Sequence, residues 1–315
     1  MACLNFLDSL YNPSMKEPVL FQNQPVREIG DAENRILVSP GHGARILLWQ
    51  HKGREVIRWP ADADWGHILK VRGGNPVLFP FIARHFVDGK NELWRDEHGT
   101  VRPMAQHGFA RDAAFAVIEH TDTELRLRLT DSEATCASYP FAFQFDVVVR
   151  LSQGSRLEIG FETTNNGTTP LPYYAGHHFY LAIPHTERAQ WTLRLPCESW
   201  ARQRPDGAMV HEEPTSDLLR LDDPAIIDRM QVQPKDATVT LANETTAQRL
   251  VFDLSHADSV PWYAVTTWTE KPDSDFYCVE PWLGLPNAIH HGEGLRHVAP
   301  GATERAACVL DASAW

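Results

Sequence analysis

Two adjacent histidines are the first residues in this chain that could do chemistry. His177 and His178 lie among four aromatic rings in the run Leu-Pro-Tyr-Tyr-Ala-Gly-His-His-Phe-Tyr-Leu-Ala-Ile-Pro (171–184). Successive side chains of a strand point to opposite faces, so we expect one histidine to face a cavity and the other to be structural. An imidazole among rings that exclude water can act as an acid or a base near neutral pH. Such a residue would need a carboxylate partner.

Glu280 is the candidate partner. It lies in Phe-Tyr-Cys-Val-Glu-Pro-Trp (276–282), where an apolar and aromatic strand pattern gives way to a loop at Pro281. The ordinary role of a glutamate at a strand end is that of a solvent-exposed rim charge. The apolar neighbours favour another role, because a carboxyl group held against apolar surface has a raised pKa and is a better base near neutrality.

A second group of polar residues lies earlier in the chain, in Arg-Gly-Gly-Asn-Pro-Val-Leu-Phe-Pro-Phe-Ile-Ala-Arg (72–84) and Met-Ala-Gln-His-Gly-Phe-Ala-Arg (104–111). Arg84 and Arg111 each end an apolar run, where a guanidinium group needs either a structural salt bridge or a ligand. His107 lies outside any clear strand. Guanidinium and imidazole groups gathered at one opening would suit a polyhydroxylated molecule, since each hydroxyl group both donates and accepts hydrogen bonds.

The elements that must position these residues have the pattern of a β protein. Apolar runs at 44–50 and 55–59 flank the turn Lys52-Gly53, which predicts a hairpin. In Thr-Glu-Leu-Arg-Leu-Arg-Leu-Thr (123–130), leucine and arginine alternate, as in a strand with one face in the core and one in water. With roughly a dozen such segments and 22 prolines, the chain is predicted to be all-β, a large antiparallel sandwich. We expect a single domain over 1–315, with 1–30 as an extended N-terminal arm.

Composition excludes several classes of function. A chain of 315 residues with 43% hydrophobic residues can fill a core, so disorder is not expected. With 41 acidic against 29 basic side chains and a net charge of −12, nucleic acid is not an expected partner. Five cysteines without a Cys-x-x-Cys spacing indicate reduced thiols. No basic leader and no bilayer-spanning apolar segment is found, so we expect no membrane association and a cytoplasmic protein.

Four motifs in this order make the chain resemble the aldose 1-epimerase (galactose mutarotase-like) superfamily from about residue 35 to residue 310. They are Arg-Gly-Gly-Asn-Pro-Val-Leu-Phe-Pro-Phe, Gln-His-Gly-Phe-Ala-Arg, Gly-His-His-Phe-Tyr-Leu-Ala-Ile-Pro and Cys-Val-Glu-Pro-Trp. Each motif alone is a weak signal, whereas four in order form a strong one. The resemblance implies a large antiparallel β-supersandwich, which agrees with the strand patterns.

The resemblance also implies roles for single residues. The family pattern His-x-Tyr selects His178 as the acid, and the late Glu-Pro-Trp motif selects Glu280 as the base. A family aspartate before an apolar segment binds a ring hydroxyl, and Asp222 is the nearest match, with Asp223 directly beside it. The positions that orient the sugar are matched by Arg84, His107 and Arg111.

The implied reaction moves only protons. Glu280 would take the proton of the anomeric hydroxyl while His178 gives one to the ring oxygen, and the hemiacetal opens to the free aldehyde. Rotation about the C1–C2 bond and reclosure yield the other anomer. No metal or cofactor is needed, and the expected partner is a small sugar or sugar phosphate. The sequence does not predict an oligomeric state.

The sequence is compatible with more than one kind of sugar ligand. Family members that act on hexose 6-phosphates hold their substrate with residues matched here by Arg72, Gln106 and Arg111, and two guanidinium groups suit a phosphate dianion. The segments around His178 and Glu280 are closer to those that act on free aldoses, which we favour. A non-catalytic carbohydrate-binding protein is a third alternative, because one fold can serve several functions. The presence of both His178 and Glu280 argues against it.

Overall fold

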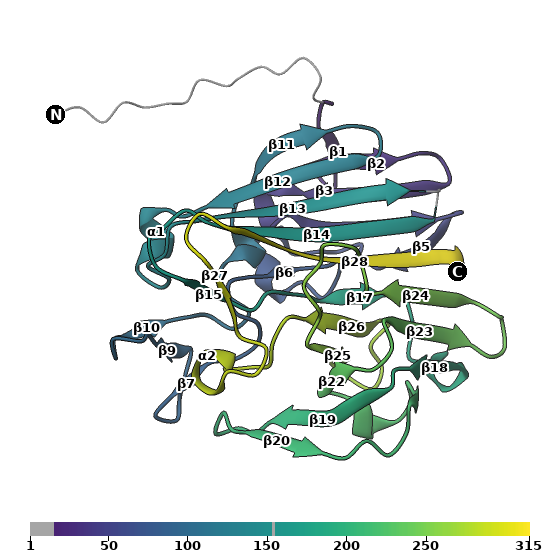
Figure 1. The fold of residues 1–315 in the computed structure, drawn as a ribbon. Coiled ribbons are helices and arrows are strands. Elements are labelled where there is room, and N and C mark those ends of the chain that lie inside the picture. Colours follow the sequence, from purple (N-terminus) through teal and green to yellow (C-terminus); the bar gives the residue numbers. More distant parts are fainter. Residues whose placement is uncertain (1–15, 153–154) are drawn as a thin grey trace.

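The computed structural model describes residues 16–152 and 155–315, and two large antiparallel sheets form most of it (Figure 1). The larger sheet has 13 strands, two of which, β16 (Gly176–His177) and β6 (Val77–Leu78), pair beside its main path. Along that path the order is β1 (Val19–Phe21), β2 (Gln24–Gly30), β3 (Asn34–Ser39), β4 (Arg45–His51), β5 (Arg54–Ile57), β17 (Phe179–Leu181), β26 (Tyr277–Trp282), β25 (Ala264–Trp268), β22 (Arg229–Pro234), β19 (Cys197–Gln203) and β20 (Met209–Glu212).

The second sheet has nine strands, and β12, β13, β14 and β28 run side by side in it (Figure 1). Its order is β11 (Ala116–His120), β12 (Glu124–Thr130), β13 (Phe143–Ser152), β14 (Arg156–Asn165), β28 (Thr303–Ala314), β24 (Arg249–Asp253), β23 (Thr238–Asn243), β18 (Trp191–Arg194) and β21 (Leu218–Arg220). The hairpin predicted at 44–59 is present as the antiparallel pair β4–β5, and the strand predicted at 123–130 is β12, which pairs with β11 and β13.

The remaining elements are short. Three strand pairs lie outside the two sheets: β7 (Phe86–Val87) with β8 (Lys90–Asn91), β9 (Leu93–Arg95) with β10 (Val101–Pro103), and β15 (Leu171–Tyr173) with β27 (Arg296–Val298). The α-helices are single turns, α1 (Glu133–Cys136) and α2 (Ala288–His291). Five 3-10 turns are also described: η1 (Pro40–His42), η2 (Trp65–Lys70), η3 (Ala110–Asp112), η4 (Arg188–Gln190) and η5 (Pro224–Ile226). Within the described parts of the chain, no helix has the length and apolar character needed to cross a bilayer.

The core lies between the two sheets, because both contribute side chains to one buried cluster. The ring of Phe79 stacks on Phe145 of β13 with centroids 4.0 Å apart, and Phe179 of β17 meets Phe252 of β24 at 5.6 Å. Burying these apolar rings from both sheets is what holds two twisted sheets face to face. The predicted all-β supersandwich is therefore confirmed.

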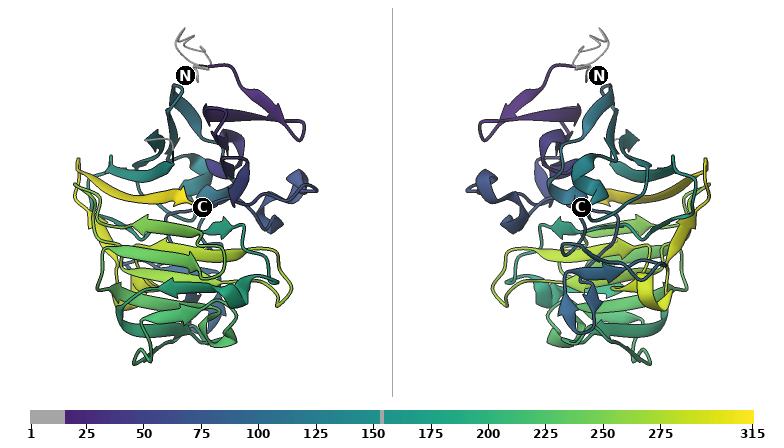
Figure 2. Two further views of the ribbon diagram at one scale, coloured as in Figure 1. Left: turned by 90° about the vertical axis from the view of Figure 1, so that its right-hand side faces the viewer. Right: turned by 90° about the vertical axis from the view of Figure 1, so that its left-hand side faces the viewer.

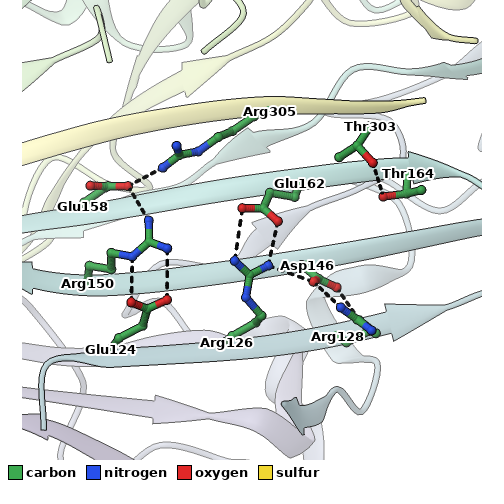
Figure 3. A network of polar contacts seen from close by, with 10 residues as sticks. All are labelled: Glu124, Arg126, Arg128, Asp146, Arg150, Glu158, Glu162, Thr164, Thr303 and Arg305. Carbon is green, nitrogen blue, oxygen red and sulfur yellow. Dashed lines mark hydrogen bonds and ion pairs between the residues drawn. The ribbon is translucent and has the colours of Figure 1, made fainter. Parts of the chain in front are cut away.

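The outer face of the nine-stranded sheet carries a ladder of ion pairs (Figure 3). Arg126 of β12 lies between Glu162 (2.6 Å) and Asp146 (3.0 Å), and Arg128 also pairs with Asp146 at 2.8 Å. The leucines that alternate with these arginines are buried in the core. The alternation at 123–130 thus separates a core face from a charged face, as predicted.

The N-terminal segment differs from the prediction of an extended arm over 1–30. Residues 24–30 are strand β2, which pairs with β3 and buries Val26 and Ile29. Only two side chains of this strand are buried, so its sequence shows no regular alternation of apolar and polar residues. Residues 1–15 of the predicted arm lie outside the described part of the chain. In Figure 2 these N-terminal strands (purple) lie at the opposite end of the molecule from the green strands of the chain's last third.

Candidate active site

A cavity of about 400 Å³ lies on the outer face of the larger sheet. Strands β17, β25 and β26 supply its floor, and the segments 69–84 and 106–111 supply its wall. Seven of the eight residues that the sequence singled out line this one cavity. They are Arg72, Arg84, Gln106, His107, Arg111, His178 and Glu280.

The two adjacent histidines point to opposite sides of the sheet. His177 lies in the core, with its ring 4.3 Å from that of Phe161 and 5.3 Å from that of Trp262. His178 lines the cavity. Strand alternation therefore places one imidazole in the core and the other at the site, as expected from the sequence.

The ring of His178 is held between aromatic side chains. Tyr180 stacks on it with centroids 4.7 Å apart and an interplanar angle of 10°, and Trp268 meets it edge-on at 5.5 Å. Only 9% of the residue is exposed. Burial, and to a lesser extent the positive charges of Arg45, Arg111 and Arg72, lower the pKa of His178 to about 3. The imidazole is therefore neutral around pH 7 in the empty cavity.

Glu280 lies directly opposite His178. Its Oε1 atom is 3.5 Å from Nε2 of His178, and the residue is 1% exposed. Burial raises the pKa of Glu280 well above its usual value, and the nearby charge of Asp228 raises it further. Burial thus favours a protonated Glu280 beside a neutral His178 while the cavity is empty, and in this state the pair holds one proton.

His107 forms part of the wall next to the pair. Its Nδ1 atom accepts a hydrogen bond from the backbone N–H of Ala83 at 3.0 Å, and its ring lies 5.7 Å from that of His178. Burial lowers the pKa of His107 well below its usual value. A neutral imidazole that accepts at Nδ1 carries its proton on Nε2, so His107 can offer a donor to a ligand.

A family model for aldose 1-epimerases matches residues 26–310. The chain belongs to the aldose 1-epimerase family. The chromosomal form of Protein LacX from Lactococcus lactis is 22% identical over 269 residues, which cover 79% of this chain and 85% of that protein.

Solved structures have the same fold as this chain. The Slr1438 protein of Synechocystis sp. PCC 6803 superimposes with a TM-score of 0.78, at 25% identity, over 99% of both chains. A galactose mutarotase related enzyme from Lactobacillus acidophilus gives a TM-score of 0.75 at 23% identity, over 91% of this chain and 96% of that chain. These likenesses show a shared fold.

Asp222 is the one predicted residue that does not line the cavity of this aldose 1-epimerase family member. Its carboxylate pairs with the guanidinium group of Arg220 two residues away, at 3.0 Å. Asp223, the alternative, accepts a hydrogen bond from the backbone N–H of Ala225 and caps the short turn η5. Asp228 lines the cavity instead. The apolar residues Ala225-Ile-Ile lie between Asp223 and Asp228, so the aspartate that reaches the cavity follows that segment rather than preceding it.

Arg45 and Asp228 line the cavity, but neither was predicted from the sequence to be a site residue. Asp228 has a left-handed backbone (φ 56°) directly before β22, a conformation that aspartate tolerates better than most residues. Arg45 begins the apolar strand β4, and an arginine at the start of so apolar a run (Ile-Leu-Leu-Trp) was the available signal. Trp268 and Thr266, from β25, also line the cavity.

A metal ion has one possible set of ligands in the cavity region. Ligand atoms of His178, Cys278 and Glu280 lie within 4.8 Å of one another. Two features oppose a cation there: burial raises the pKa of the Cys278 thiol well above its usual value, and positively charged arginines surround His178. The arrangement suits proton transfer better than metal binding.

Proposed function

We propose that this chain is an aldose 1-epimerase that interconverts the α and β anomers of a hexose. The observation that carries the proposal is the His178–Glu280 pair, separated by 3.5 Å and buried at the floor of the cavity. A buried pair that holds one proton can accept a proton at one oxygen of a sugar and deliver another at a second oxygen.

In the proposed reaction, Glu280 acts as the base toward the anomeric hydroxyl, and His178 acts as the acid toward the ring oxygen. These roles require the shared proton to be on His178 when the sugar is bound. In the empty cavity burial disfavours both charged forms and so favours the proton on Glu280. Sugar hydroxyl groups would stabilise the ion pair by hydrogen bonding, so we propose that binding moves the proton across the 3.5 Å gap.

Ring opening gives the free aldehyde, and rotation about the C1–C2 bond presents its other face. Reclosure then returns a proton from Glu280 to the anomeric oxygen and one from the ring-forming hydroxyl to His178. The two residues end the cycle as they began it, so the reaction consumes no co-reactant. His107, Asp228 and Gln106 line the same cavity and would hold the sugar hydroxyls.

A hexose 6-phosphate is the alternative substrate. It is favoured by Arg72 and Arg111, which line the cavity together with Gln106. A non-catalytic sugar-binding role is the remaining alternative, and the buried His178–Glu280 pair argues against it.

The test is the rate of anomerisation of freshly dissolved α-glucose, α-galactose and glucose 6-phosphate, followed by polarimetry or proton exchange spectroscopy. We expect acceleration by the wild type and a loss of about 10²–10⁴-fold in His178→Ala and in Glu280→Ala. His211→Ala, which removes a histidine of β20 outside the cavity lining, is the control. Unaccelerated anomerisation of sugars that nevertheless bind would establish the binding role instead.

A further inference from the structure

Asp228 reaches the cavity from the junction between the turn η5 and strand β22. Its backbone is left-handed, with a φ of 56°. A residue with a Cβ atom is strained in this conformation, so the surrounding structure must hold it there. Strand β22 lies between β19 and β25 in the larger sheet (Figure 1). Each of these two neighbours supplies a side chain that bonds the backbone around Asp228.

Arg202 of β19 bonds this backbone from one side. Its Nη1 atom donates to the carbonyl oxygen of Ile227 at 2.7 Å and to that of Asp228 at 3.4 Å. Its Nη2 atom donates to the carbonyl oxygen of Ala225. One guanidinium group thus contacts three of the four carbonyl oxygens of residues 225–228. Because a guanidinium group is a rigid, planar fork of donors, contacts of this kind fix the directions of the carbonyl groups.

Thr267 of β25 bonds the same backbone from the other side. Its carbonyl oxygen accepts a hydrogen bond from the backbone N–H of Asp228 at 2.8 Å. Its hydroxyl group donates to the carbonyl oxygen of Ile226 at 2.6 Å. Thr267 is fully buried, and the residue before it, Thr266, is the one that lines the cavity. The side chains of β19 and β25 together therefore bond every carbonyl oxygen from residue 225 to residue 228.

Arg202 does not line the cavity, whereas its neighbour Gln203 does. Among the residues that the structure describes, the side chain of Arg202 donates to these backbone carbonyl oxygens and to no carboxylate. The contacts of Arg202 can therefore affect a bound sugar only through residues 225–228. Asp228 is the residue of this segment that lines the cavity.

We propose that Arg202 and Thr267 are positioning residues that hold the carboxylate of Asp228 in the cavity. The inference rests on the proposed function for the sugar, whereas the place of Asp228 beside Glu280 is measurable without turnover. The charge of Asp228 raises the pKa of Glu280, so the two carboxyl groups lie close enough to interact. A carboxylate fixed in this way binds a sugar hydroxyl without first losing conformational freedom. If its backbone were released, both the affinity for the sugar and the pKa of Glu280 should change.

The first experiment follows the protonated carboxyl group of Glu280 by infrared spectroscopy during a pH titration without sugar, and Glu280→Gln identifies its band. We expect Arg202→Met to lower the pKa of Glu280, because the carboxylate of Asp228 moves away. Removing a positive charge would by itself have the opposite sign, since it disfavours the ionised carboxylate. Asp228→Gly, which suits the left-handed backbone, should lower the pKa as well.

The double variant Arg202→Met/Asp228→Gly separates positioning from a general loosening of the cavity. We expect its Glu280 to titrate as in Asp228→Gly alone, because no carboxylate is left to position. A further fall of the pKa in the double variant, or an unchanged pKa in Arg202→Met, would overturn the proposal. If Arg202→Met does not fold, as judged by circular dichroism, Thr267→Val takes its place in the same cycle, since valine keeps the shape and loses the hydroxyl group.

Anomerisation kinetics with α-glucose and α-galactose give a second readout. We expect Arg202→Met to raise KM several-fold while kcat at neutral pH stays near that of the wild type, since a sugar acceptor is displaced and the His178–Glu280 pair is kept. Arg204→Met is the charge-matched control, because Arg204 is exposed, pairs with Asp206 and does not line the cavity. It should keep the wild-type KM.

The two readouts separate this inference from the proposed function. Acceleration by the wild type with an unchanged KM in Arg202→Met would overturn the positioning role and leave the epimerase intact. The expected infrared titrations without acceleration of any sugar would leave the positioning role intact and overturn the epimerase.

Discussion

The side-chain oxygen of Asn75 accepts a hydrogen bond from the backbone N–H of His178 at 2.9 Å. The side-chain nitrogen of the same residue lies 3.1 Å from Nδ1 of His177. Asn75 is 1% exposed and lies just after the Arg-Gly-Gly turn, about a hundred residues before the histidines. One amide thus fixes the backbone between an imidazole in the core and an imidazole in the cavity.

Two substitutions of Asn75 should distinguish the effect of its contact with His178 from that of its contact with His177. Asn75→Ala leaves the buried N–H of His178 without an acceptor, and we expect a loss of about 1–3 kcal/mol of unfolding free energy together with a lower kcat. Asn75→Asp keeps the acceptor for His178 and loses the donor toward His177, so it should keep more of kcat than Asn75→Ala. Urea denaturation and anomerisation kinetics check both. Equal kcat values for the two variants and the wild type would show that Asn75 does not position His178.

The pH profile of kcat/KM should have no acid limb at the usual histidine pKa. In the active form the His178–Glu280 pair holds one proton. The lower pH limit of this form is the pKa of His178, which burial lowers to about 3, and its upper limit is the pKa of Glu280, which burial raises well above 4.5. Activity should therefore fall only far below the usual histidine value of 6.5 and, on the alkaline side, as Glu280 loses its proton. Initial rates corrected for spontaneous anomerisation give the profile. An acid limb centred near 6.5 would contradict this account.

Glu280→Gln should stabilise the fold, and more so at higher pH. Below its ordinary pKa of 4.5, the carboxyl group is protonated in both the folded and unfolded chains. Above that value the unfolded chain ionises while burial keeps the folded carboxyl protonated, so the wild type loses stability until its raised folded pKa is passed. Glutamine has no such loss. The gain in Tm should grow from pH 4.5 upward, while Glu244→Gln, an exposed change between β23 and β24, should show no such trend.

Asp228 and Asp222 offer a matched pair of substitutions. Asp228→Asn should raise KM about tenfold, since a cavity acceptor for a sugar hydroxyl is weakened. It should also shift the alkaline limb downward, because the charge of Asp228 raises the pKa of Glu280. Asp222→Asn breaks only a surface pair with Arg220 and should change KM little and stability by less than about 1 kcal/mol. The reverse pattern in KM would restore Asp222 as the sugar ligand.

The sequence allowed prediction of those features that depend on local pattern. Strand alternation separated His177 from His178, and the Leu/Arg alternation at 123–130 identified a strand with one charged face. Motif resemblance supplied seven of the residues that line the cavity. These signals need no knowledge of which strands are neighbours.

What could not be predicted depends on tertiary placement. Strands β19 and β22 carry charged and polar residues without clean alternation, so they were missed, although β19 brings Gln203 and β22 brings Met230 to the cavity. Asp228 reaches the cavity through a left-handed backbone that no propensity reveals. Arg45 belongs to the site only because β4 lies beside β5, which in turn pairs with β17.

The pairing of β17 between β5 and β26 also bears on how the chain folds. Leu181 is opposite Ile57 on one side, and Phe179 is opposite Val279 on the other, so three distant parts of the chain must meet before the floor of the cavity exists. Closing loops of this size is slow, since the entropy is lost before the contacts are gained. During refolding, the hairpins β4–β5 and β13–β14 should therefore form well before the chain regains any capacity to bind a sugar.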